Sequence, residues 1–176
     1  SGSVSFHQTD VAIPGNSKLP VNLKRVFRGD SYTFLNKMEF ANWQLDIPHI
    51  HTQIMFDGTK FSGSWPIGKE CSGMLNPGVV SVGGSIRYSY QYWNGDTLNV
   101  PGRVNDKLLE PYSSEFTENS SAPITRVTKS NWRMSCIERT DSSGVKVGEG
   151  FLAHAPNGDT YTFDEFRMVG ASANLK

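Results

Sequence analysis

The sequence predicts an all-β fold, mainly antiparallel, arranged as a sandwich or a strongly twisted sheet with hairpins. The chain of 176 residues contains 17 Gly, 9 Pro and 11% aromatic residues, a balance that favours short strands joined by tight turns. Stretches with the 3.6-residue period of an amphipathic helix are scarce, whereas several segments alternate apolar and polar residues. Both observations favour strands over helices.

Two N-terminal segments are expected to form a hairpin. In PVNLKRVFRG (residues 20–29), Val21, Leu23 and Phe27 alternate with mostly polar residues, which is the pattern of a half-buried strand. The preceding TDVAIPGNSKLP contains Pro14-Gly15-Asn16, a turn sequence between two apolar pieces. We therefore expect the two pieces to pair, with Gly15 in the turn.

The central part of the chain predicts further hairpins. In DIPHIHTQIMF (residues 46–56), His49 and His51 occupy the solvent-facing side of a strand, opposite Ile50. Asp57-Gly58 then provides a bend into TKFSGSW. Because a Pro follows soon, VNDKLLEPY (residues 104–112) allows only a short helix.

An aromatic run precedes one Asn-Gly pair. In SIRYSYQYW (residues 85–93), alternation assigns one face of a strand to the core, namely the face with Ile86, Tyr88, Tyr90 and Tyr92. Asn94-Gly95 tolerates the positive φ of a type I′ turn and would lead into a returning strand with Leu98 and Val100. Pro101-Gly102 is expected to turn the chain out of the sheet.

The C-terminal third predicts a meander of at least three strands. Its apolar segments are ITRVTKS, NWRMSCIERT, VKVGEGFLAHA and DTYTFDEFRMV, between residues 124 and 169. Turn sequences separate them at residues 141–144 and at Asn157-Gly158. The polar stretch PYSSEFTENSSAP (residues 111–123) is interpreted as a surface loop.

Length and charge limit the organisation and the partners of the chain. Residues 4–170 suit a single β-domain excised from a larger protein, with residues 1–3 as a tag remnant and residues 171–176 as a tail or linker. The 17 basic and 17 acidic side chains cancel, so the positive charge of a nucleic-acid-binding protein is missing. No apolar run approaches the roughly 20 residues of a membrane-spanning helix. We expect neither a nucleic-acid partner nor a membrane span.

Cys71 and Cys136 are the only cysteines. A disulfide between them would close a loop of about 65 residues and stabilise the fold by about 4 kcal/mol in the chain-entropy model. The alternative is two unpaired buried thiols, as in a cytosolic protein.

Aromatic residues raise the possibility of a ligand site. Trp93 lies with Gln91 on the face opposite the tyrosines, so Trp93 is the aromatic residue that we single out for contact with a glycan or a partner, together with Gln91 and Trp65. Flat aromatic side chains of this kind commonly stack on ligand rings.

Metal and catalytic sites find less support. His49 and His51 project to one side, but two imidazoles are too few for a metal site. A polysaccharide hydrolase needs two carboxyl groups facing a cleft, and the candidates are Asp10, Glu39, Asp46, Glu138, Asp164 and Glu165. Spacing does not pair any two of them, and neither GxSxG nor HExxH is present. We predict a non-enzymatic protein without metal or cofactor.

Several blocks of the sequence occur in a distinctive order. These are TDVAIPGNSKLPV, FANWQLDIP, WPIGKEC, YWNGDTLNVPG with KLL, WRMSC and GFLAHAPNGDTYTFD, between residues 9 and 164. In order and number they resemble the segment that introduces the shell of bacterial RHS/YD-repeat proteins. One departure is Glu70 before Cys71, where that pattern has an arginine.

The resemblance implies a large secreted or cell-surface bacterial protein whose YD repeats wind into a hollow β-shell around a variable, often toxic, segment. The chain would be a non-catalytic structural or interaction domain preceding the repeats. Its implied partners are the remainder of its own YD-repeat chain, secretion machinery, another subunit or a second copy bound through a sheet edge. Export favours the Cys71–Cys136 disulfide, and the matching glycines are expected in turns, namely Gly15, Gly95, Gly102 and Gly158. The alternatives are a glycan-binding β-module and a polysaccharide hydrolase.

Overall fold

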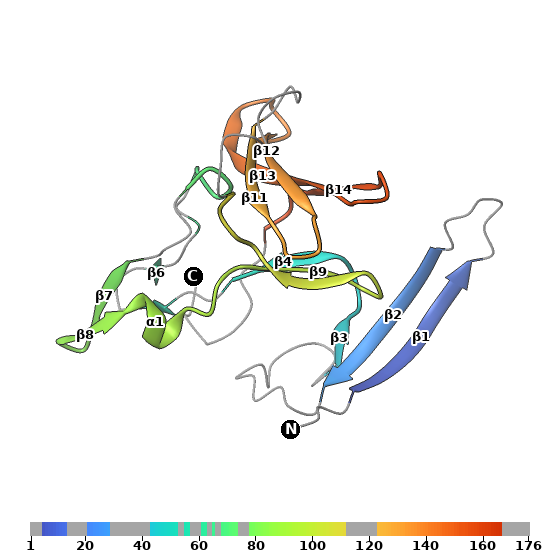
Figure 1. Ribbon diagram of the computed structural model, residues 1–176, viewed down its shortest axis with the longest axis horizontal. Coiled ribbons are helices and arrows are strands. Elements are labelled where there is room, and N and C mark those ends of the chain that lie inside the picture. The colour runs from blue at the N-terminus through green and yellow to red at the C-terminus, as the bar shows by residue number, and fades with distance from the viewer. Residues whose placement is uncertain are drawn as a thin grey trace. The chain divides into compact units, whose positions relative to one another are not determined.

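The computed structural model has an all-β fold, as the sequence predicts (Figure 1). It describes residues 5–13, 21–28, 43–52, 55–56, 61–62, 65, 68–73, 78–111 and 123–166. Within these residues every strand pair is antiparallel. The chain divides into two units, Ser1–Pro48 with Arg167–Lys176, and His49–Phe166. The expected domain ends at residues 4 and 170 lie outside the described residues, so that division stays a prediction.

The first unit contains a three-stranded sheet. Its strands, in the order β1-β2-β3, are β1 (Ser5–Ile13), β2 (Val21–Arg28) and β3 (Trp43–Leu45). The pairing of β1 with β2 confirms the expected hairpin, while its turn, including Gly15, lies outside the described residues. Across the sheet, the ring of Phe27 lies 6.2 Å from that of Phe6 and 5.7 Å from that of Trp43. Aromatic cross-strand pairs of this kind stabilise the sheet and its register.

Among its described residues, the second unit contains four small sheets. Its first sheets have the orders β10-β9-β4, β5-β6 and β7-β8. Their strands are β4 (His49–His51), β5 (Met55–Phe56), β6 (Phe61–Ser62), β7 (Val79–Val82), β8 (Ser85–Tyr88), β9 (Thr97–Val100) and β10 (Val104–Lys107). A four-residue helix, α1 (Ser89–Tyr92), follows β8. The pairing of β5 with β6 agrees with the bend expected at Asp57-Gly58, although residues 57–60 are not described.

The C-terminal meander is confirmed. Its four strands pair in sequence order as β11 (Ile124–Val127), β12 (Arg133–Thr140), β13 (Lys146–His154) and β14 (Thr160–Phe163). The turns lie where Gly144 and Gly158 adopt positive φ angles of 78° and 90°, a conformation that glycine adopts without steric cost. A bridge between Leu109 and Val127, with hydrogen bonds in both directions, ties the segment after β10 to this meander.

The hydrophobic core of the second unit joins the β9–β10 hairpin to the meander. Its buried members are Cys71, Leu98, Val100, Val104, Leu108, Trp132, Met134, Phe151, Ala153 and Ala155. The period of two along β12 and β13 explains why alternate residues point into one core. At Gly150, an added Cβ atom would lie 2.7 Å from the backbone oxygen of Phe163, so β13 and the end of β14 approach closely only because this residue has no side chain.

The predicted burial of the tyrosine run is wrong. Ile86, Tyr88 and Tyr90 are 62%, 48% and 78% exposed. The strand ends at Tyr88, because the chain then turns into α1 and loses the period of two. All four residues of β8 are exposed, whereas Val80 on the neighbouring strand β7 is buried. Alternation separates two faces of a strand but does not say whether either face meets the core.

Two turn assignments are also wrong. Asn94-Gly95 does not join β8 to β9, because β8 pairs with β7 through Gly83-Gly84, whose φ angles of 57° and 77° are both positive. This double glycine supplies the geometry of a type I′ turn. Pro101-Gly102 does not lead the chain out of the sheet, since it joins β9 to β10 as a hairpin. Residues 104–107 form strand β10 where the sequence allowed a short helix.

Candidate functional site

The structure brings Trp65 and Trp93, both predicted as binding residues, to the same carboxylate. The Nε1 atom of Trp65 donates a hydrogen bond of 2.9 Å to Oδ2 of Asp96, and Nε1 of Trp93 donates one of 3.3 Å to Oδ1. Nε1 of Trp93 also lies 3.1 Å from Oγ1 of Thr52. Asp96 is only 2% exposed. A buried carboxylate that accepts hydrogen bonds from two indoles holds both rings in fixed positions.

Asp96 was missed by the sequence analysis, which interpreted its neighbourhood as a hairpin turn. No local signal identified it, because the burial of strand β9, directly after Asp96, is known only from the structure. A carboxylate beside buried apolar residues needs compensating donors.

Arg126 adds a buried positive charge to this region. It is 7% exposed, and its guanidinium donates to the backbone oxygens of Thr125, at 2.7 Å, and Gly73. Burial lowers the pKa of Arg126, while the carboxylates of Asp96 and Glu110 act in the opposite direction. Asp96 therefore contributes to the charge balance of Arg126 as well as to the position of the tryptophans.

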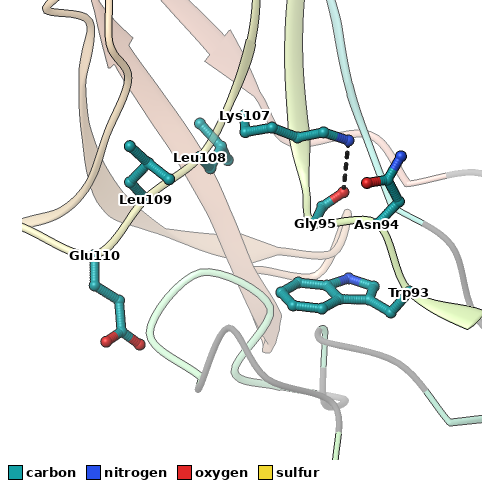
Figure 2. Close-up of a pocket in the computed structure, with 7 residues that line it drawn as sticks. All are labelled: Trp93, Asn94, Gly95, Lys107, Leu108, Leu109 and Glu110. Atoms are coloured by element: carbon teal, nitrogen blue, oxygen red, sulfur yellow. Dashed lines mark hydrogen bonds between the residues drawn. The ribbon is translucent and has the colours of Figure 1, made fainter. Parts of the chain in front are cut away.

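An open depression of about 480 Å³ lies beside Trp93 (Figure 2). It is lined by Trp93, Asn94, Gly95, Lys107, Leu108, Leu109 and Glu110. Figure 2 shows Trp93 on one side and Leu108, Leu109 and Glu110 on the other, with the side chain of Lys107 extending toward Gly95. Nζ of Lys107 lies 2.9 Å from Oγ1 of Thr97 and 3.5 Å from the backbone oxygen of Gly95. The depression therefore combines an aromatic ring, apolar side chains and two opposite charges.

The other two predicted binding residues do not line this depression. Trp65 packs in the core, where its ring lies 5.8 Å from that of Phe151 and 5.5 Å from that of Phe166. Oε1 of Gln91 accepts a hydrogen bond of 2.9 Å from the backbone N–H of Tyr88 and thereby caps α1. Of the three, only Trp93 is available to a ligand here.

Cys71 and Cys136 are paired, with their Sγ atoms 2.15 Å apart and 65 residues between them in sequence. The pair ties the short loop of residues 68–73 to β12 of the meander. Cys71 is fully buried within the core. The disulfide therefore joins two distant parts of the second unit.

Two glutamates hold the same loop. The carboxylate of Glu149, on β13, accepts hydrogen bonds from the backbone N–H groups of Cys71 and Ser72, at 3.3 and 2.8 Å, and from Oγ of Ser72, at 2.9 Å. In return, Oε2 of Glu70 accepts a hydrogen bond of 2.9 Å from the backbone N–H of Glu149. Glu70 also lies 3.9 Å from Arg139. Glu70 thus satisfies a strand donor that would otherwise need another partner.

We expect the hydrogen bonds between Glu149 and this loop to stabilise the fold less in acid. Burial raises the pKa of Glu149, but the hydrogen bonds from Ser72 and Cys71 outweigh it, so the pKa lies below its ordinary value of 4.5. A lowered pKa in the folded state stabilises the protein above the unfolded-state pKa, and this stabilisation is lost as the pH falls through the folded-state pKa. Glu149→Gln should lower the free energy of unfolding at pH 7. It should also reduce the further decrease in the free energy of unfolding as the pH falls below 4.5.

Urea unfolding of the wild type and Glu149→Gln between pH 3 and pH 7 measures this effect. Glu138→Gln is the matched control, because Glu138 lies directly opposite Glu149 on β12 and forms an exposed ion pair with Lys146. Equal slopes of stability against pH in the wild type and Glu149→Gln would contradict the prediction.

Most of the remaining candidate carboxylates form ion pairs or are exposed. No group of three His, Cys, Asp or Glu side chains suited to a metal is found among the described residues, and the rings of His49 and His51 lie 5.4 Å apart on β4. Asp10 pairs with Arg25, Asp46 with His7, and Glu138 with Lys146. Asp164 and Glu165 are exposed, and Glu39 is not described. In this part of the chain, Glu110 is the acidic residue that lines the depression.

In the described ranges, no helix is long and apolar enough to cross a membrane. Comparison of the chain with family models, with curated proteins and with solved structures found no match.

Proposed function

We propose that the chain is a non-catalytic structural and interaction domain that precedes the YD-repeat shell of a large secreted or cell-surface bacterial protein of the RHS type. The observation that carries this proposal is the set of contacts made by side chains in the sequence blocks that resemble RHS/YD-repeat proteins. Their distinctive side chains bind one another: Trp65 and Trp93 bind Asp96, and Cys71 pairs with Cys136. Residues used in this way support an architectural function.

The turns of the same blocks support this interpretation. Gly102, with a φ angle of 72°, forms the β9–β10 turn, and Gly158 forms the β13–β14 turn. Arg103, directly after the first of these turns, forms an ion pair with Asp159, directly after the second. The blocks thus supply turns and cross-links between hairpins.

The disulfide supports export. Disulfides persist in oxidising compartments and are rare in the cytosol. The Cys71–Cys136 pair therefore agrees with a secreted or cell-surface location.

The sheet of the first unit offers a place for the shell or another subunit to bind. Strand β1 is nine residues long and lies at the edge of its sheet in the described part of the chain. Its side chains Phe6, Val11 and Ile13 are all exposed. An open edge with apolar side chains accepts a strand from a partner by backbone hydrogen bonding.

Hydrogen–deuterium exchange tests the proposal. Two proteins are compared: the chain alone, and a longer protein in which the chain is joined to the next part of its reading frame, where we expect tandem YD repeats. In the longer protein, the amides of β1 should exchange at least tenfold more slowly, while those of the internal strand β12 should stay unchanged. Ile13→Lys should remove this protection and Thr162→Lys, at an exposed position on β14, should not. Unchanged exchange in β1, or a reading frame without YD repeats, would contradict the proposal.

A further inference from the structure

The depression beside Trp93 has the features of a ligand site and is not explained by a scaffold role. Its volume of about 480 Å³ lies within the range of small-molecule sites, roughly 300–1,000 Å³. We propose that it binds an uncharged pyranose ring of an oligosaccharide. This inference goes beyond the proposed function, because a scaffold needs no ligand here.

Trp93 is held in place before any ligand arrives. Its indole N–H is directed to Oδ1 of Asp96 and Oγ1 of Thr52, and its backbone N–H donates a hydrogen bond of 2.8 Å to the backbone oxygen of Ser89. Asp96 is in turn bound by Trp65. Binding a ligand therefore costs little conformational entropy of the Trp93 side chain, which favours affinity at an otherwise shallow surface.

Polar side chains line the depression together with the Trp93 ring. Asn94, Lys107 and Glu110 line the depression and are exposed. Lys107 has three N–H bonds and uses two of them on Thr97 and Gly95. An amide, an ammonium and a carboxylate together offer both donors and acceptors, as the hydroxyl groups of a sugar require.

The charges of the lining favour a neutral ligand. Lys107 and Glu110 are the ionised side chains of the depression, and their charges cancel. A phosphate or nucleotide would meet the Glu110 carboxylate without an excess of positive charge, which disfavours its binding. A neutral pyranose has an apolar face for the indole and for Leu109, and hydroxyl edges for the polar groups.

Calorimetric titration tests the inference on the whole chain. The probes are cellohexaose, chitohexaose, xylohexaose and mannohexaose at concentrations up to 10 mM, with a proline-rich decapeptide as the competing ligand class. We expect at least one sugar to bind, and Glu110→Gln to weaken its binding roughly tenfold, because hydrogen bonds to charged groups are among the stronger ones. Asn94→Ala should weaken it by a smaller factor.

Two further variants complete the test. Trp93→Ala should abolish binding, and urea unfolding shows whether this variant stays folded. Tyr90→Ala is the matched control, since Tyr90 is an exposed aromatic residue outside the depression, and should leave the affinity unchanged. The inference is overturned if no sugar binds, if the peptide binds in place of the sugars, or if Glu110→Gln and Asn94→Ala leave the affinity unchanged. Because β1 plays no part in this experiment, its failure would leave the proposed scaffold function untouched.

Discussion

The double variant Cys71→Ala with Cys136→Ala is expected to lose about 4 kcal/mol of unfolding free energy. The disulfide closes a loop across 65 residues, and its loss restores the conformational freedom of that loop in the unfolded state. Urea unfolding followed by tryptophan fluorescence measures the difference. A loss of this size is a large part of the 5–15 kcal/mol that is usual for a domain.

Reduction provides an independent check. The wild type in excess dithiothreitol should also lose about 4 kcal/mol of unfolding free energy, whereas the double variant should not respond to the reductant. Each comparison controls for the other, because the variant also changes core packing at the fully buried Cys71. Identical unfolding curves for the oxidised and reduced wild type would contradict the prediction.

Asp96→Ala is expected to destabilise the protein by about 3–5 kcal/mol, the usual cost of removing one partner from a buried charged network. The substitution leaves the indole N–H of Trp65 without Oδ2 and that of Trp93 without Oδ1, and it removes a negative charge that favours the buried Arg126 guanidinium. Asp96→Asn keeps one acceptor oxygen and should cost less. Urea unfolding of both variants gives the order.

Asp141→Ala is the control for this prediction. Asp141 also accepts two hydrogen bonds, from the backbone N–H groups of Ser143 and Val145, at 2.8 and 3.0 Å. It lies in an exposed turn, where water replaces lost partners, so we expect a cost of only about 1 kcal/mol. If Asp96→Ala costs no more unfolding free energy than Asp141→Ala, the buried network around Asp96 does not stabilise the fold.

Much of the strand arrangement is predictable because its signals are local. Alternation in the last third of the chain, with glycines at residues 144 and 158, predicts the meander of β11 to β14. The β1–β2 hairpin follows from the same kind of pattern. The pattern of residues 85–93 predicts the wrong strand pairing, because α1 interrupts the alternation and the double glycine at residues 83–84 forms the turn that pairs β8 with β7.

The candidate site is predictable only in part. Trp93 could be singled out, because an aromatic residue on the polar face of a strand has no evident place in a core. The residues around Trp93 could not be predicted, since the β9–β10 hairpin is what brings Lys107 to Glu110 to the depression beside it.

The sequence by itself determined the all-β class, most of the strands and the positions where glycine permits a turn, since each depends on residues a few positions apart. Only the tertiary structure decided that both faces of β8 are exposed and that Asp96 binds an indole 31 residues away. Burial and such contacts depend on how distant segments pack, and the alternation along one segment carries no information about the segment that will cover it.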